Sequence, residues 1–63
     1  MKTMKYVYWK HGDSWIGYPE DFPDYWTQAD TREELQANLK DLYEELTRGT
    51  IPEVRRVAEL RLS

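Results

Sequence analysis

The sequence lacks several features that stabilise or anchor other small proteins. It contains no cysteine, which excludes a disulfide and a thiolate zinc site, and its single histidine excludes a site built from several imidazoles. No apolar run approaches the roughly 20 residues that span a bilayer, and the N-terminus does not have the pattern of a signal peptide. We therefore expect a cytoplasmic protein with no cofactor, no metal and no membrane contact.

The chain is short and rich in aromatic residues. Its 63 residues are expected to form one domain, 1–63, with three tryptophans, five tyrosines and an aromatic content of 14%. A domain of this size buries only about 60% of the surface that its unfolded chain exposes. Without disulfides or metals, such a domain usually needs association with another chain. We therefore expect a homodimer or a homotetramer.

The charge is unevenly distributed along the chain. The net charge is −3, but residues 12–53 contain three basic and eleven acidic residues, whereas both ends of the chain are basic. An acidic protein is poorly suited to non-specific nucleic-acid binding, which depends on phosphate neutralisation. The acidic middle either attracts a basic partner by electrostatic steering or forms a solvated surface that keeps the chain soluble.

Three segments in the first half of the chain are predicted to be strands. Residues 6–9 and 15–18 are rich in aromatic and β-branched side chains, and the turn-forming residues 11–14 between them indicate a hairpin. Two prolines in residues 19–24 mark a loop. Residues 25–28 then form a short third strand.

A helix is predicted from the capping signals and the leucine spacing that follow. Thr31 and Glu34 have the spacing of a capping box, and Gly49 and Pro52 fit the end of a helix. One helix face carries leucines at helical period, which we expect to form the core. These residues are Leu35, Leu39, Leu42 and Leu46.

The C-terminal residues change to a period of two. Ala58, Leu60 and Leu62 alternate with Glu59 and Arg61, which predicts a fourth strand with one solvated face. The predicted fold class is therefore α+β with the order β-β-β-α-β. The fourth strand can lie beside the third strand or the first. We expect the first, partly from the resemblance described below, which gives the sheet order 3-2-1-4 with the helix on one face.

Both faces of the predicted sheet carry large apolar or aromatic groups, and one helix covers only one face. A contiguous uncovered patch usually marks an interaction site, although tyrosines also line solvated faces as amphipathic groups. The pattern does not separate core residues from interface residues among these aromatics. The candidates for contact with a partner or a second copy are Tyr6, Tyr8, Trp9, Trp15, Tyr18, Tyr25 and Trp26.

With these elements in place, the chain resembles the HicB-family antitoxins of bacterial toxin–antitoxin pairs. The similarity rests on residues 6–8, on the strand 15–18, on the string FPDYWTQADTREEL at residues 22–35, and on the leucine-rich helix that continues from it. It covers roughly residues 4–60 of the chain.

The resemblance implies a partially degraded ribonuclease-H-like fold, dimers or higher oligomers, and a non-catalytic module. It implies that this module binds a small basic HicA-type toxin, which cuts messenger RNA, and blocks its active site. Many members of the family carry a C-terminal DNA-binding domain, whereas this sequence ends at Ser63, directly after the predicted last strand. The resemblance is therefore to a short form that lacks this domain, and it does not support operator DNA binding.

The acidic residues do not form the pattern that nuclease chemistry needs. Ribonuclease-H chemistry requires several carboxylates that converge on two metal ions. The candidates Asp13, Asp21, Asp24 and Asp30 all fall in predicted loops or at the helix start. The only histidine, His11, lies in a turn that does not provide the partners of a general base. We therefore expect no enzyme activity.

The residues alone also allow a nucleic-acid function. Aromatic side chains on a sheet face can stack on bases, and the basic residues of the two terminal strands would lie on adjoining strands of the predicted sheet. These residues are Lys2, Lys5, Lys10, Arg55, Arg56 and Arg61. The alternative is therefore an orphan HicB-like domain that binds single-stranded RNA.

Overall fold

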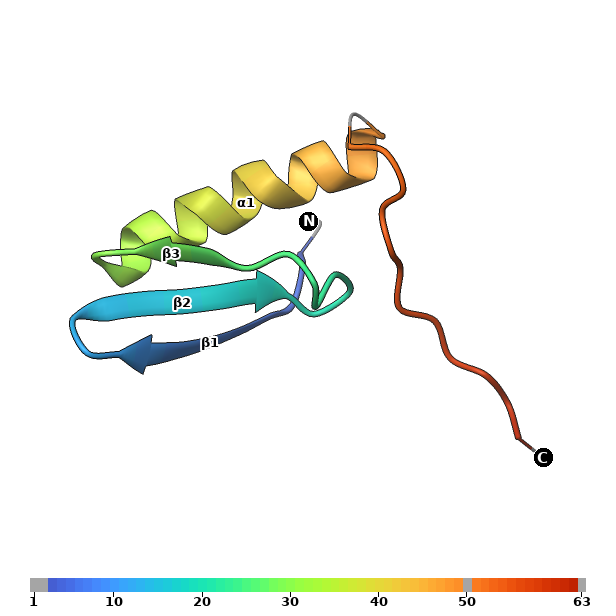
Figure 1. Cartoon of the computed structure of the whole chain (residues 1–63), viewed down its shortest axis with the longest axis horizontal. Coiled ribbons are helices and arrows are strands. Elements are labelled where there is room, and N and C mark those ends of the chain that lie inside the picture. The colour runs from blue at the N-terminus through green and yellow to red at the C-terminus, as the bar shows by residue number, and fades with distance from the viewer. Residues whose placement is uncertain (1–2, 50, 63) are drawn as a thin grey trace.

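The computed structural model describes residues 3–49 and 51–62 and has a small α+β fold (Figure 1). Three antiparallel strands form one sheet in the order β1-β2-β3, and a single helix follows them. The elements are β1 Tyr6–His11, β2 Ser14–Pro19, β3 Thr27–Ala29 and α1 Arg32–Arg48. The predicted α+β class and the order of the first three strands are confirmed.

β1 and β2 form the hairpin that the sequence predicts, and they pair over their whole length. The ladder extends one pair further, because the N–H of Glu20 donates to the carbonyl of Lys5 at 2.9 Å. Hydrogen-bonded and non-bonded pairs alternate along an antiparallel ladder. Pro19, opposite Tyr6, therefore occupies a non-bonded pair, where its missing N–H removes no bond to β1.

β3 is shorter and begins later than the predicted strand 25–28, since it covers only Thr27–Ala29. The N–H of Tyr25 donates to the carbonyl of Phe22 at 3.1 Å, so the chain is still turning at this point. Trp26 therefore precedes the strand.

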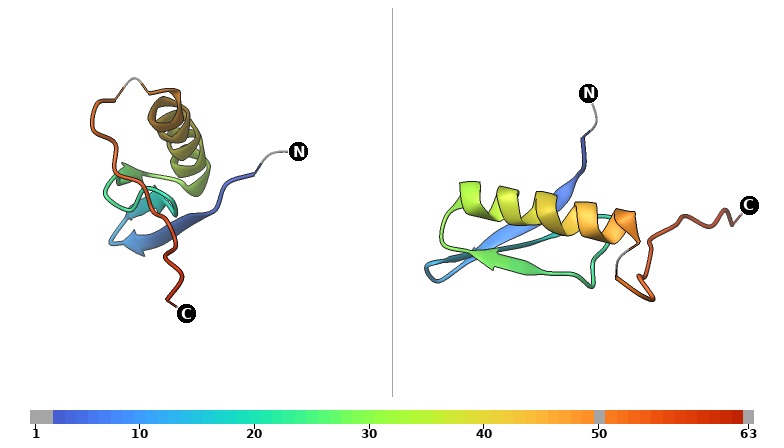
Figure 2. Two further views of the ribbon diagram at one scale, coloured as in Figure 1. Left: turned by 90° about the vertical axis from the view of Figure 1, so that its right-hand side faces the viewer. Right: turned by 90° about the horizontal axis from the view of Figure 1, so that it is seen from above.

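α1 begins and ends where the sequence predicts. Thr31 is the N-cap, with an extended backbone (φ −130°, ψ 160°), and its hydroxyl oxygen accepts the N–H of Glu34 at 3.1 Å. Gly49 ends the helix at φ 84°, in the left-handed region where other residues are strained. The helix lies on one side of the sheet (Figure 2) and packs against β2 and β3.

The core lies between α1 and the sheet. Leu35, Leu39 and Leu46 are buried and Leu42 is half-buried, as the leucine spacing predicts. Ala29 of β3 joins Leu35 and Leu39 in the central cluster, and aromatic side chains of β1 and β2 pack against it. The helix therefore supplies most of the buried apolar surface.

A second buried group lies at the loop between β2 and β3, where no periodic pattern of residues predicts it. Phe22 is only 3% exposed. Its ring meets the rings of Tyr25 and Tyr43 edge-on, with centroids 6.4 Å and 5.8 Å away. Because Tyr43 belongs to α1, Phe22 anchors the loop to the helix.

The predicted fourth strand is not formed in residues 51–62, which are the described residues after the helix. Residues 54–62 have no regular secondary structure, and Leu60 and Leu62 are 84% and 89% exposed. Figures 1 and 2 show this segment passing the end of the sheet and leading away from it. Among the described residues, β1 is therefore an edge strand, and only the first three strands of the expected order 3-2-1-4 are present.

Two contacts near the helix end explain the path of the C-terminal segment. The guanidinium of Arg55 forms an ion pair with Asp24 at 3.1 Å, and the N–H of Val57 donates to the carbonyl of Asp21 at 3.3 Å. Both partners lie in the loop between β2 and β3. The segment is thus held beside that loop and does not reach the free edge of β1.

Gly17 lies close to both the neighbouring strand and the helix. A Cβ atom built at this position would be 2.8 Å from the carbonyl oxygen of Val7 and 3.4 Å from a methyl carbon of Leu35. Gly17→Ala should lower the free energy of unfolding by about 1–3 kcal/mol, because backbone atoms of the ladder must shift. Urea denaturation followed by circular dichroism measures the change, and an unchanged midpoint would contradict this close approach.

Candidate functional site

The alternation of side chains sorts the candidate interface residues onto two sides of the sheet. Gly17 faces the helix, since a Cβ atom there would approach Leu35, and Tyr8 of β1 lies directly opposite Gly17. Directly opposite residues share a side, and so do alternate residues along one strand. The helix side thus carries Tyr6, Tyr8 and Trp15, and the outer side carries Trp9, Tyr18 and Trp26.

Trp9, Tyr18 and Trp26 form one group of touching rings, which we call the outer aromatic cluster. The centroids of Trp9 and Trp26 are 5.0 Å apart with the rings edge-to-face, and Tyr18 stacks on Trp26 at 6.0 Å with an interplanar angle of 14°. The only helix in residues 3–49 and 51–62 lies on the opposite side of the sheet. Trp26 is 60% exposed as a result.

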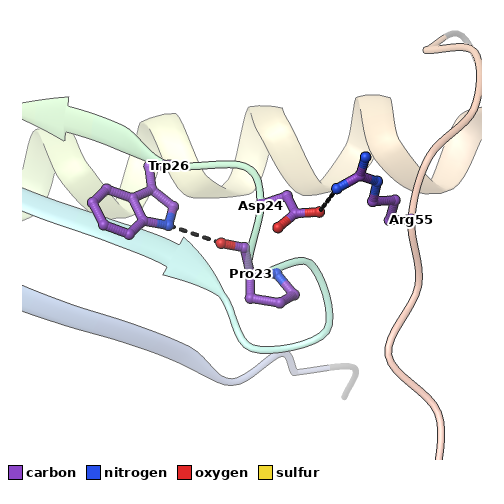
Figure 3. A network of polar contacts seen from close by, with 4 residues as sticks. All are labelled: Pro23, Asp24, Trp26 and Arg55. Carbon is purple, nitrogen blue, oxygen red and sulfur yellow. Dashed lines mark hydrogen bonds and ion pairs between the residues drawn. The ribbon is translucent and has the colours of Figure 1, made fainter.

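The indole of Trp26 is held in one orientation although it is exposed. Its Nε1–H donates to the carbonyl of Pro23 at 2.8 Å (Figure 3). The stacked ring of Tyr18 supports one face of the indole. A side chain that is ordered before binding loses little conformational entropy when a partner covers it. This cluster is therefore suited to recognition.

The loop next to Trp26 is acidic. Glu20, Asp21 and Asp24 are exposed between β2 and β3, and Asp24 forms the ion pair with Arg55 (Figure 3). Both side chains of this pair are exposed, so the pair contributes little to stability. The carboxylates at the rim of the outer aromatic cluster favour a partner with basic groups.

The aromatic residues on the helix side make contacts within the chain. The hydroxyl oxygen of Tyr6 accepts hydrogen bonds from Gln36 Nε2 at 3.0 Å and from Arg32 Nη2 at 3.2 Å. The guanidinium carbon of Arg32 lies 4.2 Å from the centroid of the Tyr8 ring, and Trp15 packs against the leucine cluster. These contacts tie β1 and β2 to α1, although Tyr8 is still 41% exposed.

The hydrogen bonds from Gln36 and Arg32 lower the pKa of Tyr6 below its ordinary value, because both donors favour the phenolate. The folded pKa is thus below the unfolded value of about 10. The associated stability is fully present above the unfolded pKa and is lost as the pH falls through the folded pKa. Phenolate absorbance should therefore rise at a lower pH in the wild type than in Tyr6→Phe. A coincident onset would contradict this network.

Tyr25 lies on neither side of the sheet. It is half-buried in the loop between β2 and β3, against the buried phenylalanine of that loop. Val7 and Ile16 were not among the candidates, but they share the outer side, because they lie opposite Tyr18 and Trp9 in the hairpin. The two-residue alternation of the predicted strands already contained this signal.

The carboxylates considered for nuclease chemistry lie in separate places. Asp13 is in the hairpin turn, Asp21 and Asp24 are in the loop between β2 and β3, and Asp30 precedes α1. In the part of the chain that the structure describes, no group of three or more His, Cys, Asp or Glu residues is placed to hold a metal ion. This part also includes no helix that is both long and apolar enough to cross a membrane.

The chain matches no family model, no curated protein and no solved structure. Its function is therefore inferred from the sequence resemblance described above and from three features of the fold. These are the outer aromatic cluster, the acidic loop beside it and the open edge of β1.

Proposed function

We propose that the chain is a non-catalytic protein-binding module that acts in the cytoplasm as an antitoxin of the HicB type. In this proposal it binds a small basic HicA-type toxin and blocks the site at which the toxin cuts mRNA. The outer aromatic cluster carries the proposal, because its three rings touch on the side of the sheet opposite α1 and Trp26 is 60% exposed.

The rings and the carboxylates together suit a basic protein surface. Tryptophan and tyrosine are enriched among the residues that dominate binding energy at interfaces. The exposed carboxylates of Glu20 and Asp21 add attraction for lysine and arginine. A toxin that cuts RNA must itself present a basic surface to phosphates. A module that covers this surface would bind the toxin and exclude its substrate at once.

The proposal includes self-association as a homodimer or homotetramer and the ribonuclease-H-like sheet that the resemblance implies. The described sheet supplies the first three strands of the order 3-2-1-4. The exposed segment that contains Leu60 and Leu62 alternates as a strand does. Pairing of this segment with a sheet edge in an oligomer would complete the sheet and cover the leucines.

Single-stranded RNA is the competing ligand for the same rings, since exposed rings on a sheet can stack on bases. The positions of the charged groups favour the protein partner. Lys10 lies on the helix side, with its Nζ 5.5 Å from the ring centroid of Trp15, and Arg55 is paired with Asp24. The charged side chains of the loop that leads to Trp26 are acidic, which disfavours a polyanion.

Two binding experiments on the purified chain test the proposal. The first probe is the small basic toxin expected to be encoded beside this gene, and the second is an unstructured single-stranded RNA oligonucleotide. We expect a complex with the toxin in size-exclusion chromatography and loss of its RNA cleavage. The absence of such a neighbouring gene, or of a complex, overturns the proposal. RNA binding that weakens steeply with salt supports the alternative instead.

A further inference from the structure

We propose that the C-terminal segment 58–62 of a second copy of this chain adds to the open edge of β1 as the fourth strand. Its leucines would fill the groove between β1 and α1. This inference rests on the self-association proposed above and specifies how it occurs. It leaves the outer aromatic cluster free, so it is separate from toxin binding.

The free edge of β1 has a regular row of unpaired backbone groups. Lys5 and Glu20 form a hydrogen-bonded pair. Every second residue of β1, counted from Lys5, therefore hydrogen-bonds to β2 through its backbone. The N–H and C=O groups of Tyr6, Tyr8 and Lys10 therefore point away from β2. No strand of residues 3–49 and 51–62 pairs with them. Such an edge is a template for another strand.

A groove accompanies this edge on the helix side of the sheet. The backbone of α1 lies close to β2 and β3, whereas α1 reaches β1 through the side chains of Tyr6 and Tyr8. A cavity of about 490 Å³ lies between the helix and the start of β1. Met4 and Tyr6 line it from the strand side, and Leu39, Tyr43 and Thr47 line it from the helix. Alternate side chains of a strand added to β1 would point into this groove.

The C-terminal segment has the properties of the missing strand. Ala58, Leu60 and Leu62 lie on one side of an extended chain, and Glu59 and Arg61 lie on the other. The two leucines are 84% and 89% exposed, so their own chain does not cover them. In strand addition, backbone hydrogen bonds give affinity, and pockets for alternate side chains give specificity. An apolar groove beside a free edge meets both requirements.

The anchored start of the segment points to a second copy as its acceptor. The N–H of Val57 is bonded to Asp21, directly after the last residue of the extended β2 ladder. The position of a fourth strand lies two strand spacings from there, about 10 Å away. Beyond this contact the segment leads away from its own sheet and does not turn towards that position (Figures 1 and 2). The same segment of a neighbouring copy can approach the edge from outside.

Reciprocal exchange of the two segments gives a closed dimer. Each copy donates residues 58–62 and accepts the same residues from its partner, so the contact is self-complementary under a twofold axis. Both free β1 edges are then paired, which also protects them from further association. The contacts of Arg55 with Asp24 and of Val57 with Asp21 persist in this arrangement.

The oligomeric state of the full chain tests the inference. We expect the wild type to sediment as a dimer and the double variant Leu60→Asp, Leu62→Asp to sediment as a monomer with an unchanged helical circular dichroism spectrum. The matched control is Glu59→Gln, Arg61→Gln on the other side of the strand, which should remain dimeric. A monomeric wild type, or a dimer that the leucine variant leaves intact, would overturn the inference.

A mixed-label NMR experiment identifies the donor of the strand. In a mixture of isotope-labelled and unlabelled chains, we expect intermolecular contacts between the methyl groups of Leu60 or Leu62 and the groove residues Met4 or Tyr43. The same contacts within one copy only would overturn the inference. The dimer should persist in Trp26→Ser, a variant of the outer aromatic cluster. If this variant loses toxin binding but remains a dimer, toxin binding and dimer formation use different surfaces, and each proposal can fail without the other.

Discussion

Replacing Leu39 with alanine is expected to lower the free energy of unfolding by about 2–5 kcal/mol. The side chain is 1% exposed and belongs to the central cluster with Ala29 and Leu35. Its removal leaves a cavity between α1 and the sheet, and the loss is greatest where the helix cannot move to close that cavity. The loss is a large share of the roughly 5–15 kcal/mol that stabilises an ordinary domain.

Urea denaturation, followed by circular dichroism and tryptophan fluorescence, measures this change. The matched control is Leu42→Ala on the same helix, which should be milder because Leu42 is only half-buried. The chain concentration is kept constant within the first series and is varied in a second series, because association stabilises the folded form. Equal losses for the two variants would show that the helix face is misassigned.

The helix and the hairpin could be predicted from the sequence because their signals are local. Thr31 caps the helix through the N–H of a residue three positions later, and Gly49 ends it in a backbone conformation that few other residues adopt. The leucine period then fixes the buried face of the helix. These interactions need no knowledge of distant parts of the chain.

The partner of the C-terminal segment could not be predicted in the same way. A period of two at Ala58, Leu60 and Leu62 describes a strand with one apolar side, but it does not say which edge accepts that strand. The ion pair of Arg55 with Asp24 joins residues 31 positions apart and sets the direction of the chain. A contact of this kind does not produce a periodic pattern in the sequence, so it could not be predicted.

The distribution of side chains on the two sides of the sheet could be predicted from the sequence only in part. Alternation predicted that both sides carry aromatic residues. It did not show which side the helix covers. The structure shows that the helix covers the side of Gly17, where a Cβ atom would be 3.4 Å from a methyl carbon of Leu35. Phe22 was missed because it lies between two prolines, in a loop without periodicity.

Replacing Trp26 with serine is expected to weaken binding of the proposed toxin by about 30-fold or more, since a central aromatic anchor typically contributes at least about 2 kcal/mol. The ring is 60% exposed, stacks on Tyr18 and is fixed by its hydrogen bond to Pro23. Its loss removes contact area and also the support of the neighbouring rings. Isothermal titration calorimetry with the purified toxin measures the change.

The control for this variant is a residue of the other side. Tyr8→Ala removes an aromatic ring that is 41% exposed on the helix side, and it should leave toxin affinity within about threefold, a change of less than 1 kcal/mol. Trp26→Phe keeps a ring but loses the N–H that donates to Pro23, so its effect should fall between the other two. If Tyr8→Ala weakened binding as much as Trp26→Ser, the toxin would have to contact the helix side, and the outer aromatic cluster would not be its site.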